Sequence, residues 1–379
     1  MRVMYVAPRF HTNQSAVVKG WIERGDTVTF ISYYKAIIED YSYVEPIVLG
    51  FSPLYYPIDY LYMNVIRRND PANTAFKINH GFPPIWRLRK VMKREKPDLV
   101  ILRDRTLYTM VAYWFCRRYG YTSILYNQSP LWEFPSRRNF LHRLVRKWTP
   151  QKRMTPVIGQ QEPGKQIEDH SFYVPFVAEP RMSPEQKEYF QDKKIEILSI
   201  GKFEPRKHHI MMIEVAAELA GEFADIHLTI IGEATGRLQK EHLAEVREYV
   251  KSHQLERLVD IQINVPRKKT DEYYAKTDIF VIPSTREMAS ISQLEAMSFS
   301  IPVIISNKNG SAGYVENEKN GYYFEDSNQE SLREKLKKLL ADKAKIKEMG
   351  KYSYNLVTEK YTFTNYYQAV MEIAQGECQ

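Results

Sequence analysis

The sequence predicts an α/β protein made of two doubly wound domains. The chain of 379 residues is long enough for two domains of ordinary size, and 44% of its residues are hydrophobic. Short apolar runs typical of buried strands alternate with segments of helical period in both halves. This alternation indicates parallel sheets joined by right-handed crossovers. A segment rich in proline and charge, residues 176–194, separates the halves. We therefore expect domains at residues 1–176 and 177–360, followed by a terminal segment at 361–379.

The N-terminal half contains five apolar runs that we predict to be strands. They occupy residues 3–7, 27–32, 98–102, 123–126 and 156–158. Two basic segments of helical period lie between them, at residues 85–96 and 140–147.

The C-terminal half repeats the alternation more regularly. We predict strands at residues 195–201, 226–232, 258–263, 278–283 and 302–306. We predict helices at residues 210–222, 238–253, 270–276 and 289–298, and an aromatic amphipathic helix at 361–374. The turn that begins at Gly232 lacks a second glycine, so by itself it is a weak phosphate signal.

Two carboxylates eight positions apart are the strongest functional signal. Glu287 lies in the loop after the strand at 278–283, and Glu295 lies about two turns into the following helix. A loop at the carboxyl end of a strand and the start of a helix is where doubly wound proteins bind nucleotides and phosphates. The two side chains could contact different parts of one elongated ligand. By spacing alone, however, an ordinary pair of solvated carboxylates explains the pattern better.

A basic cluster follows the strand at 195–201. Gly201 is followed by Lys202, and Arg206 and Lys207 come shortly after. Cations at a strand end can surround a diphosphate and stabilise a leaving group that gains negative charge. A solvated basic turn is the alternative.

Together these segments resemble retaining glycosyltransferases of family 4, which have the GT-B fold. The resemblance rests on Glu287, the LEAM sequence at 294–297, PVI at 302–304, the turn NGSAG at 309–313 and NG at 320–321. The order and spacing of these motifs match the family. Two departures are visible: Ser300 and Ile301 replace the usual glycine before PVI, and the turn reads GSAG. The likeness is strong over residues 195–324, looser in the tail and weak over residues 1–176.

The resemblance implies a role for each matching residue. Glu295 would hold the ribose hydroxyls and Glu287 the sugar hydroxyls of a nucleotide diphosphate sugar, most naturally a UDP- or GDP-sugar. Lys202 and Lys207 would neutralise the diphosphate, although the family has Arg at the first of these positions, and Lys loses the bidentate fork. The implied donor-binding residues are Gly201, Arg206, Met288, Ala289, Ser290, Ile291 and Glu295. No paired aspartates suggest a metal site, and no cofactor is expected. The terminal helix would cross back to the first domain.

The acceptor side can be inferred only from the strand ends of the N-terminal half. The first strand leads into His11 and Asn13, the strand at 98–102 into Arg103 and Asp104, and the next into Asn127. The family usually has glycines in the first of these loops, and this chain has none. For each loop a structural role is an equally good interpretation.

Positive charge is concentrated in the N-terminal half. Residues 1–176 contain 26 Lys and Arg against 14 Asp and Glu, whereas the rest contain 28 against 32, within an overall net charge of +8. The segment 140–148 places apolar residues on one helical face with arginines beside it. This pattern is typical of a helix on an anionic membrane and equally of an ordinary domain helix. No nucleic-acid motif accompanies the basic charge.

The remaining features favour a cytoplasmic enzyme, with peripheral contact at the inner face of the membrane as one option. The two cysteines offer neither a disulfide framework nor metal-ligand spacing. We find no signal peptide and no apolar run approaching ~20 residues.

We therefore predict a glycosyltransferase, hexose-transferring and metal-independent, whose acceptor is a glycan or lipid-linked molecule of cell-surface polysaccharide or glycoconjugate synthesis. Two alternatives stay open. One is a sugar-nucleotide epimerase or phosphorylase on the same fold. The other is a non-catalytic protein that binds sugar nucleotides.

Overall fold

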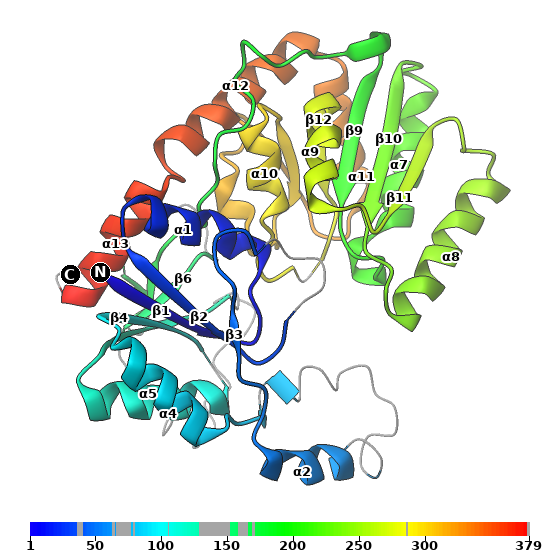
Figure 1. The fold of residues 1–379 in the computed structure, drawn as a ribbon. Coiled ribbons are helices and arrows are strands. Elements are labelled where there is room, and N and C mark those ends of the chain that lie inside the picture. Colours follow the sequence, from blue (N-terminus) through cyan, green and yellow to red (C-terminus); the bar gives the residue numbers. More distant parts are fainter. Residues whose placement is uncertain are drawn as a thin grey trace.

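The computed structural model describes residues 1–35, 41–62, 65, 77–78, 80–104, 106–128, 152–157, 166–168, 171–285 and 287–376. It contains two twisted sheets, each with helices packed against it (Figure 1). The first sheet has eight strands in the order β3-β2-β1-β4-β5-β6-β8-β7, and the second has six in the order β11-β10-β9-β12-β13-β14. All pairings are parallel except that of β7 with β8.

The N-terminal domain is built around β1, whose residues are nearly all buried because the strand is covered on both faces. Its strands are β1 Arg2–Ala7, β2 Thr27–Ser32, β3 Ile47–Val48, β4 Leu99–Arg103, β5 Thr122–Tyr126, β6 Arg153–Thr155, β7 Gln166–Glu168 and β8 Ser171–Tyr173. Its helices are α1 Thr12–Glu23, α2 Tyr56–Leu61, α4 Ile85–Glu95 and α5 Leu107–Tyr119.

The C-terminal domain repeats the same strand order locally. Its strands are β9 Ile195–Ile200, β10 Ile226–Gly232, β11 Val259–Ile263, β12 Ile279–Ile282, β13 Val303–Ser306 and β14 Gly321–Phe324. Its helices are α7 His209–Ala220, α8 Arg237–Ser252, α9 Arg267–Lys276, α10 Ser292–Ser298, α11 Gln329–Leu340 and α12 Lys343–Glu359. In both sheets the strand order reverses beside the first strand, between β1 and β4 and between β9 and β12. Such reversal points are where doubly wound proteins bind ligands.

The terminal helix α13, Phe363–Gln375, packs on the first domain, as the resemblance implied (Figure 1). Its buried residues Tyr366, Val370 and Ile373 belong to the core that contains Tyr5 and Trp21. The indole ring of Trp21 also meets the ring of Phe363 edge-on, with centroids 5.3 Å apart. The chain therefore crosses between the domains twice, and this limits how they can move relative to each other.

A tyrosine from the second domain also ties the domains together. The Tyr314 hydroxyl donates to the carbonyl of Pro156, at 2.9 Å, and accepts from the backbone N–H of Phe176, at 2.8 Å. These contacts lie beside the segment between the two domains, so the hinge region is packed and hydrogen-bonded rather than extended.

Most predicted elements of the second domain appear within a few residues of their expected bounds, since its strands are continuous apolar runs. Two predictions were wrong. The strand expected at 156–158 is β6, Arg153–Thr155, because Arg153 pairs with Leu125 and the ladder ends before Pro156, which has no N–H to donate. The helix expected from 289 begins at Ser292, because residues 287–291 form an irregular loop. The segment 140–148 lies outside the described residues. No helix in the described ranges is both long and apolar enough to span a bilayer.

Candidate active site

Two loops meet at the reversal point of the second sheet. One follows β9 and carries Lys202, Arg206 and Lys207. The other follows β12 and carries Glu287. Because β9 and β12 are parallel neighbours, their carboxyl ends open at the same edge of the sheet. The sequence places these residues far apart, and the strand order brings them together.

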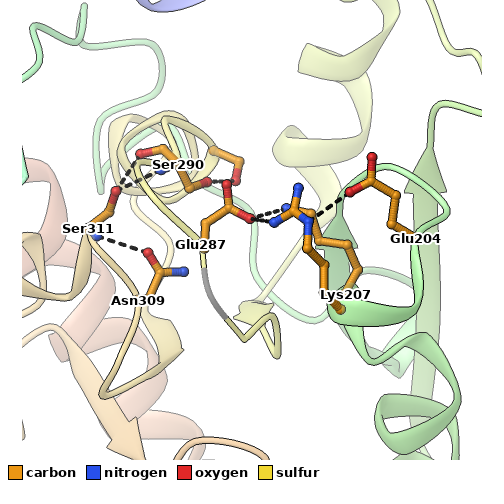
Figure 2. Close-up of polar contacts among 8 residues, drawn as sticks. Glu204, Lys207, Glu287, Ser290, Asn309 and Ser311 are labelled. Carbon is orange, nitrogen blue, oxygen red and sulfur yellow. Dashed lines mark hydrogen bonds and ion pairs between the residues drawn. The ribbon is translucent and has the colours of Figure 1, made fainter. Parts of the chain in front are cut away.

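Glu287 joins the two loops. Its carboxylate accepts hydrogen bonds from Lys207 Nζ and from Arg206 Nη1, the second at 2.7 Å (Figure 2). The side chains of Glu287 and Lys207 are only 13% and 12% exposed. Burial raises the pKa of Glu287, but the charges of Lys207 and Arg206 outweigh it and hold the pKa below its usual range. At neutral pH the site therefore holds an ionised carboxylate between two cations.

The backbone turn after β9 sets the position of Lys207. Pro205 begins a short 3-10 turn that ends at Lys207, and the N–H of Lys207 bonds the carbonyl of Glu204 at 2.9 Å. His208 then adopts a left-handed conformation, φ 51°, and redirects the chain into α7. The stem of Lys207 lies over Gly201, where an added Cβ would come 3.1 Å from Lys207 Cδ. The glycine thus leaves room for the lysine to reach Glu287.

The loop that carries Glu287 is held by the turn after β13. The backbone N–H of Gly310 donates to the carbonyl of Glu287 at 2.8 Å. A side chain at Gly310 would place its Cβ only 1.9 Å from the carbonyl oxygen of Met288, so the close approach requires glycine. Ser311 Oγ accepts from the N–H of Ser290 and donates to its carbonyl, both at 2.8 Å (Figure 2). The N–H of Ser290 is therefore already used by the protein.

Two neighbouring N–H groups are candidates for binding a ligand. Within the described part of the chain, the backbone N–H groups of Ala289 and Ile291 have no hydrogen-bond acceptor. Both residues are half-buried, and they flank the Ser290 pairing just before α10.

Glu295 lies on α10 and is held by two residues of α9. Its Oε1 is 2.8 Å from Arg267 Nη2, and its Oε2 accepts from the Tyr274 hydroxyl at 3.0 Å. Tyr274 is fully buried, so its hydrogen bond orients the carboxylate from behind. Sequence reasoning missed both partners. The signal for Arg267 was its position at the start of a helix soon after the end of β11.

Lys202 does not share the Glu287 cluster. Its nearest carboxylate is Glu233, after β10, at 3.4 Å, and the side chain is 41% exposed. The two lysines expected to act together therefore have different partners: the largely buried Lys207 pairs with Glu287, and the more exposed Lys202 pairs with Glu233.

A cavity of about 300 Å³ opens between the two domains beside Glu295. Its lining from the second domain includes Arg267, Ile291 and Glu295, and its lining from the first domain includes Phe10 and Lys19. Lys19 is 2.7 Å from Glu179 in the segment that joins the domains. A bound molecule would thus touch both domains.

Comparison with known proteins identifies the domain that carries this site. Residues 183–356 match the family model described as glycosyl transferases group 1. This domain belongs to that family.

Curated relatives of this glycosyltransferase domain match over less than half of the chain. Spore coat protein SA of Bacillus subtilis is 26% identical over 179 residues, which are 42% of this chain and 43% of that protein. The poly(ribitol-phosphate) alpha-N-acetylglucosaminyltransferase of Staphylococcus aureus is 27% identical over 177 residues, 46% of this chain and 34% of that protein. The alignments therefore span well under half the length of either relative.

Solved structures extend the likeness to the whole chain at the level of fold. A glycosyltransferase of Rickettsia africae superimposes with a TM-score of 0.71 and 14% identity, covering 99% of this chain and 98% of that one. The Anabaena protein HepE, solved in complex with UDP-glucose, superimposes with a TM-score of 0.70 and 11% identity, covering 99% of this chain and 100% of that one. The group 1 domain and the N-terminal domain thus form a GT-B fold.

The structure separates the predicted acceptor-side residues of this glycosyltransferase fold into two sets. Asp104 and Asn127 make structural contacts: Asp104 lies 3.8 Å from the buried Arg153, and the N–H of buried Asn127 bonds the carbonyl of Met154. Asn13 lies in the first turn of α1 and lines a small apolar pocket with Tyr5.

The other two acceptor-side residues lie at strand ends of the first sheet. His11 precedes α1 at the end of the loop after β1, and Arg103 is the last residue of β4. Both lie at the reversal point of the first sheet. Among the described residues, no three His, Cys, Asp or Glu side chains converge as metal ligands.

Proposed function

We propose that this protein is a retaining glycosyltransferase that transfers a hexose from a nucleotide diphosphate sugar to a glycan or lipid-linked acceptor. The observation that carries the proposal is the convergence of Lys207, Arg206 and Glu287 at the reversal point, with Glu295 on the adjoining helix. The arrangement provides cations for a diphosphate and separate carboxylates for two sets of hydroxyls. Domains at 1–176 and 177–360 and a terminal segment at 361–379 are part of the proposal.

The donor would lie along the edge of the second sheet. Glu295 would hold the ribose hydroxyls, and the N–H groups of Ala289 and Ile291 would donate to the diphosphate. Lys207 would neutralise the phosphate oxygens, and Lys202 would approach them from the more exposed side of the site. Glu287 would then accept hydrogen bonds from the sugar hydroxyls in place of some of those that it accepts from Arg206 and Lys207. UDP is the first nucleotide to test, since HepE was solved with UDP-glucose; GDP is the second.

Transfer would break the bond between the anomeric carbon and the diphosphate oxygen. The acceptor oxygen would bond to the same carbon on the same face, and its proton would pass to the departing phosphate oxygen. Lys202 and Lys207 would stabilise the charge that develops on that oxygen, a task that preorganised cations perform well in an enclosed site. The proposed reaction therefore draws its positive charge from side chains and needs no metal ion.

The experiment has a binding stage and a reaction stage. A thermal-shift screen of UDP- and GDP-sugars should raise the unfolding temperature for at least one donor, because ligand binding stabilises the native state by mass action. The selected donor is then incubated with chelator, with and without a mixture of glycan and lipid-linked acceptors. Sugar transfer only when acceptor is present supports the proposal. Conversion of donor alone to an isomer would indicate an epimerase, and binding without turnover would indicate a binding protein.

We further propose a cytoplasmic location with peripheral contact at an anionic membrane, through the exposed surface of α4 and α5. The helices lie side by side, with Arg89 Nε donating to the Tyr119 hydroxyl at 3.0 Å. Trp86 and Trp114 are 77% and 51% exposed on this surface. The exposed basic residues of this α4–α5 surface are Arg87, Lys90, Lys93, Arg94, Arg117 and Arg118. Basic residues beside exposed tryptophans suit a lipid interface.

Vesicle sedimentation tests this surface. Binding to anionic vesicles should weaken as salt rises, because each basic residue contributes ~1 kcal/mol within a Debye length of the surface. The double change Lys90→Glu with Lys93→Glu should abolish binding, and Trp86→Ala should weaken it. The matched change Lys251→Glu, on an exposed position of α8, should leave it intact. No binding at low salt, or equal loss in the control, would reject the surface.

A further inference from the structure

The first turn of α9 carries positive charge where a helix does not favour it. Arg267, Lys268 and Lys269 open the helix, and no acidic residue lies in that turn. The N–H groups at a helix start already present partial positive charge, so cations there weaken the helix. Of the three, Arg267 is paired with a carboxylate of the described residues, that of Glu295. The stability of α9 therefore does not explain Arg267, whereas its contact with Glu295 does.

The turn before α9 places Arg267 at the binding edge of the second sheet. Asn264 follows β11 in a left-handed conformation, φ 53°, and its N–H donates to the carbonyl of Gly232 at 2.9 Å. Pro266 precedes the helix, and α9 begins at Arg267. Because β11, β10, β9 and β12 are all parallel, the start of α9 lies at the edge where the loops after β9 and β12 open. Arg267 can therefore reach Glu295 at the start of α10.

The contacts of Glu295 leave part of its carboxylate open. A carboxylate has about four acceptor positions, two on each oxygen. Arg267 Nη2 lies 2.8 Å from Oε1, and the Tyr274 hydroxyl lies 3.0 Å from Oε2 and 3.3 Å from the carbonyl of Ser292. One acceptor position on each oxygen thus has no donor among the described residues. Glu295 and Arg267 both line the cavity between the domains, so a ligand there can supply the two donors.

The form of the Arg267 contact favours a positioning role over a purely structural ion pair. Pairs of guanidinium and carboxylate are frequently bidentate, with two parallel N–H bonds to both oxygens. Here the close contact of Arg267 is with Oε1, while Oε2 accepts from the hydroxyl of the buried Tyr274. The two partners hold the carboxylate from two sides and leave both oxygens able to accept. This arrangement suits a vicinal diol, which presents two hydroxyl donors side by side.

We propose that Arg267 is a positioning residue that fixes the Glu295 carboxylate for the two ribose hydroxyls of the donor, so that the site selects nucleotides that carry both hydroxyls. This rests on the proposed transfer from a nucleotide sugar and names the residue that sets selection for ribose. Without Arg267 the carboxylate has one fixed partner, Tyr274, and the ligand itself must order the side chain. Arg267 thus acts through Glu295 and does not itself touch the reacting atoms.

The experiment is calorimetry on the full chain with UDP and with 2′,3′-dideoxy-UDP. The measured quantity is the ribose preference, defined as the ratio of the two affinities at constant ionic strength. The parent should prefer UDP by roughly tenfold or more, the usual effect of a hydrogen bond to a charged acceptor. Arg267→Gln should reduce that ratio by roughly two- to tenfold, because binding must then immobilise the Glu295 side chain. Any attraction of Arg267 to the diphosphate is common to both ligands and cancels in the ratio.

Two further variants show whether the effect comes from a cation held against Glu295. Arg267→Lys keeps a donor of similar reach and should restore most of the ribose preference. Lys269→Gln removes a charge from an exposed position in the same helical turn and should keep the preference of the parent. An unchanged ratio in Arg267→Gln would overturn the proposal, as would an equal fall in Lys269→Gln. A ratio in Arg267→Lys as low as in Arg267→Gln would also overturn it.

Failure of the proposed function would look different. If the parent binds both nucleotides equally, or neither, in the uridine pair and in the matching guanosine pair, the donor assignment fails and the role of Arg267 fails with it. If the parent prefers the ribonucleotide and Arg267→Gln keeps that preference, the role of Arg267 fails alone. Thermal unfolding shows whether each variant folds. Should Arg267→Gln not fold, Tyr274→Phe removes the other hydrogen bond to Glu295, and an unchanged ribose preference there would overturn the proposal.

Discussion

Replacing Glu295 by glutamine is the most direct test of the donor site. The change keeps the size of the side chain and leaves an oxygen to accept from the buried Tyr274 hydroxyl. It removes the negative charge that faces Arg267 at 2.8 Å and that would accept from the ribose hydroxyls. The fold should therefore survive while nucleotide recognition is lost.

The expected size of the effect follows from the contacts. Losing a hydrogen bond to a charged acceptor costs ~1.5–3 kcal/mol, which corresponds to roughly 10- to 150-fold in affinity. Arg267 works against this loss, because a guanidinium freed from its carboxylate can attract the diphosphate. Arg267→Gln in the same background removes that compensation. Since ribose is common to the nucleotide and the sugar nucleotide, both should lose affinity by a similar factor.

Calorimetric titration with UDP and with UDP-glucose measures the effect. Glu222→Gln is the matched control, because Glu222 is an exposed carboxylate paired with Lys337 at 2.5 Å, outside the proposed site. Unchanged UDP affinity in Glu295→Gln, both with and without Arg267→Gln, would refute the ribose assignment. A loss confined to UDP-glucose would refute it as well, because it would place Glu295 at the sugar.

Three further predictions follow from the described contacts. Lys207→Ala should lower turnover by ~10²–10³, far more than Lys202→Arg, and parent-like rates in both would reject the diphosphate role. Gly310→Ala should destabilise the protein by ~1–3 kcal/mol and weaken donor binding, because its Cβ would lie 1.9 Å from a carbonyl oxygen; thermal unfolding and calorimetry check this. Burial raises the pKa of Glu316, but hydrogen bonds from Lys360, Tyr352 and Lys319 lower it to about 2. This carboxylate therefore stabilises the fold above the unfolded pKa of ~4.3, and that contribution is lost as pH falls toward 2. The difference in unfolding temperature between the parent and Glu316→Gln should be constant above about pH 5 and shrink below it; a difference independent of pH would contradict the assignment.

The elements of the second domain could be read from the sequence because local signals agree there. Its strands are continuous apolar runs, and its helices α8 and α11 each keep one apolar face. Hydrophobic period is a property of neighbouring residues, so it needs no tertiary information. The ends of helices were predicted less well where a contact from elsewhere in the chain overrides the hydrophobic period. Helix α10 begins only at Ser292, because the loop before it is shaped by the hydrogen bond between Glu287 and Gly310.

The sequence by itself determined the fold class and the donor-side candidates of this protein, since hydrophobic periodicity and motif spacing depend only on the order of residues along the chain. Only the tertiary structure decided which residues act together. Glu287 meets Lys207 across 80 positions because β9 and β12 are neighbours in the sheet. Lys202, although near Lys207 in sequence, turns to Glu233 and faces the other domain. Strand order and domain packing set these contacts, and they arise from long-range burial that no local pattern encodes.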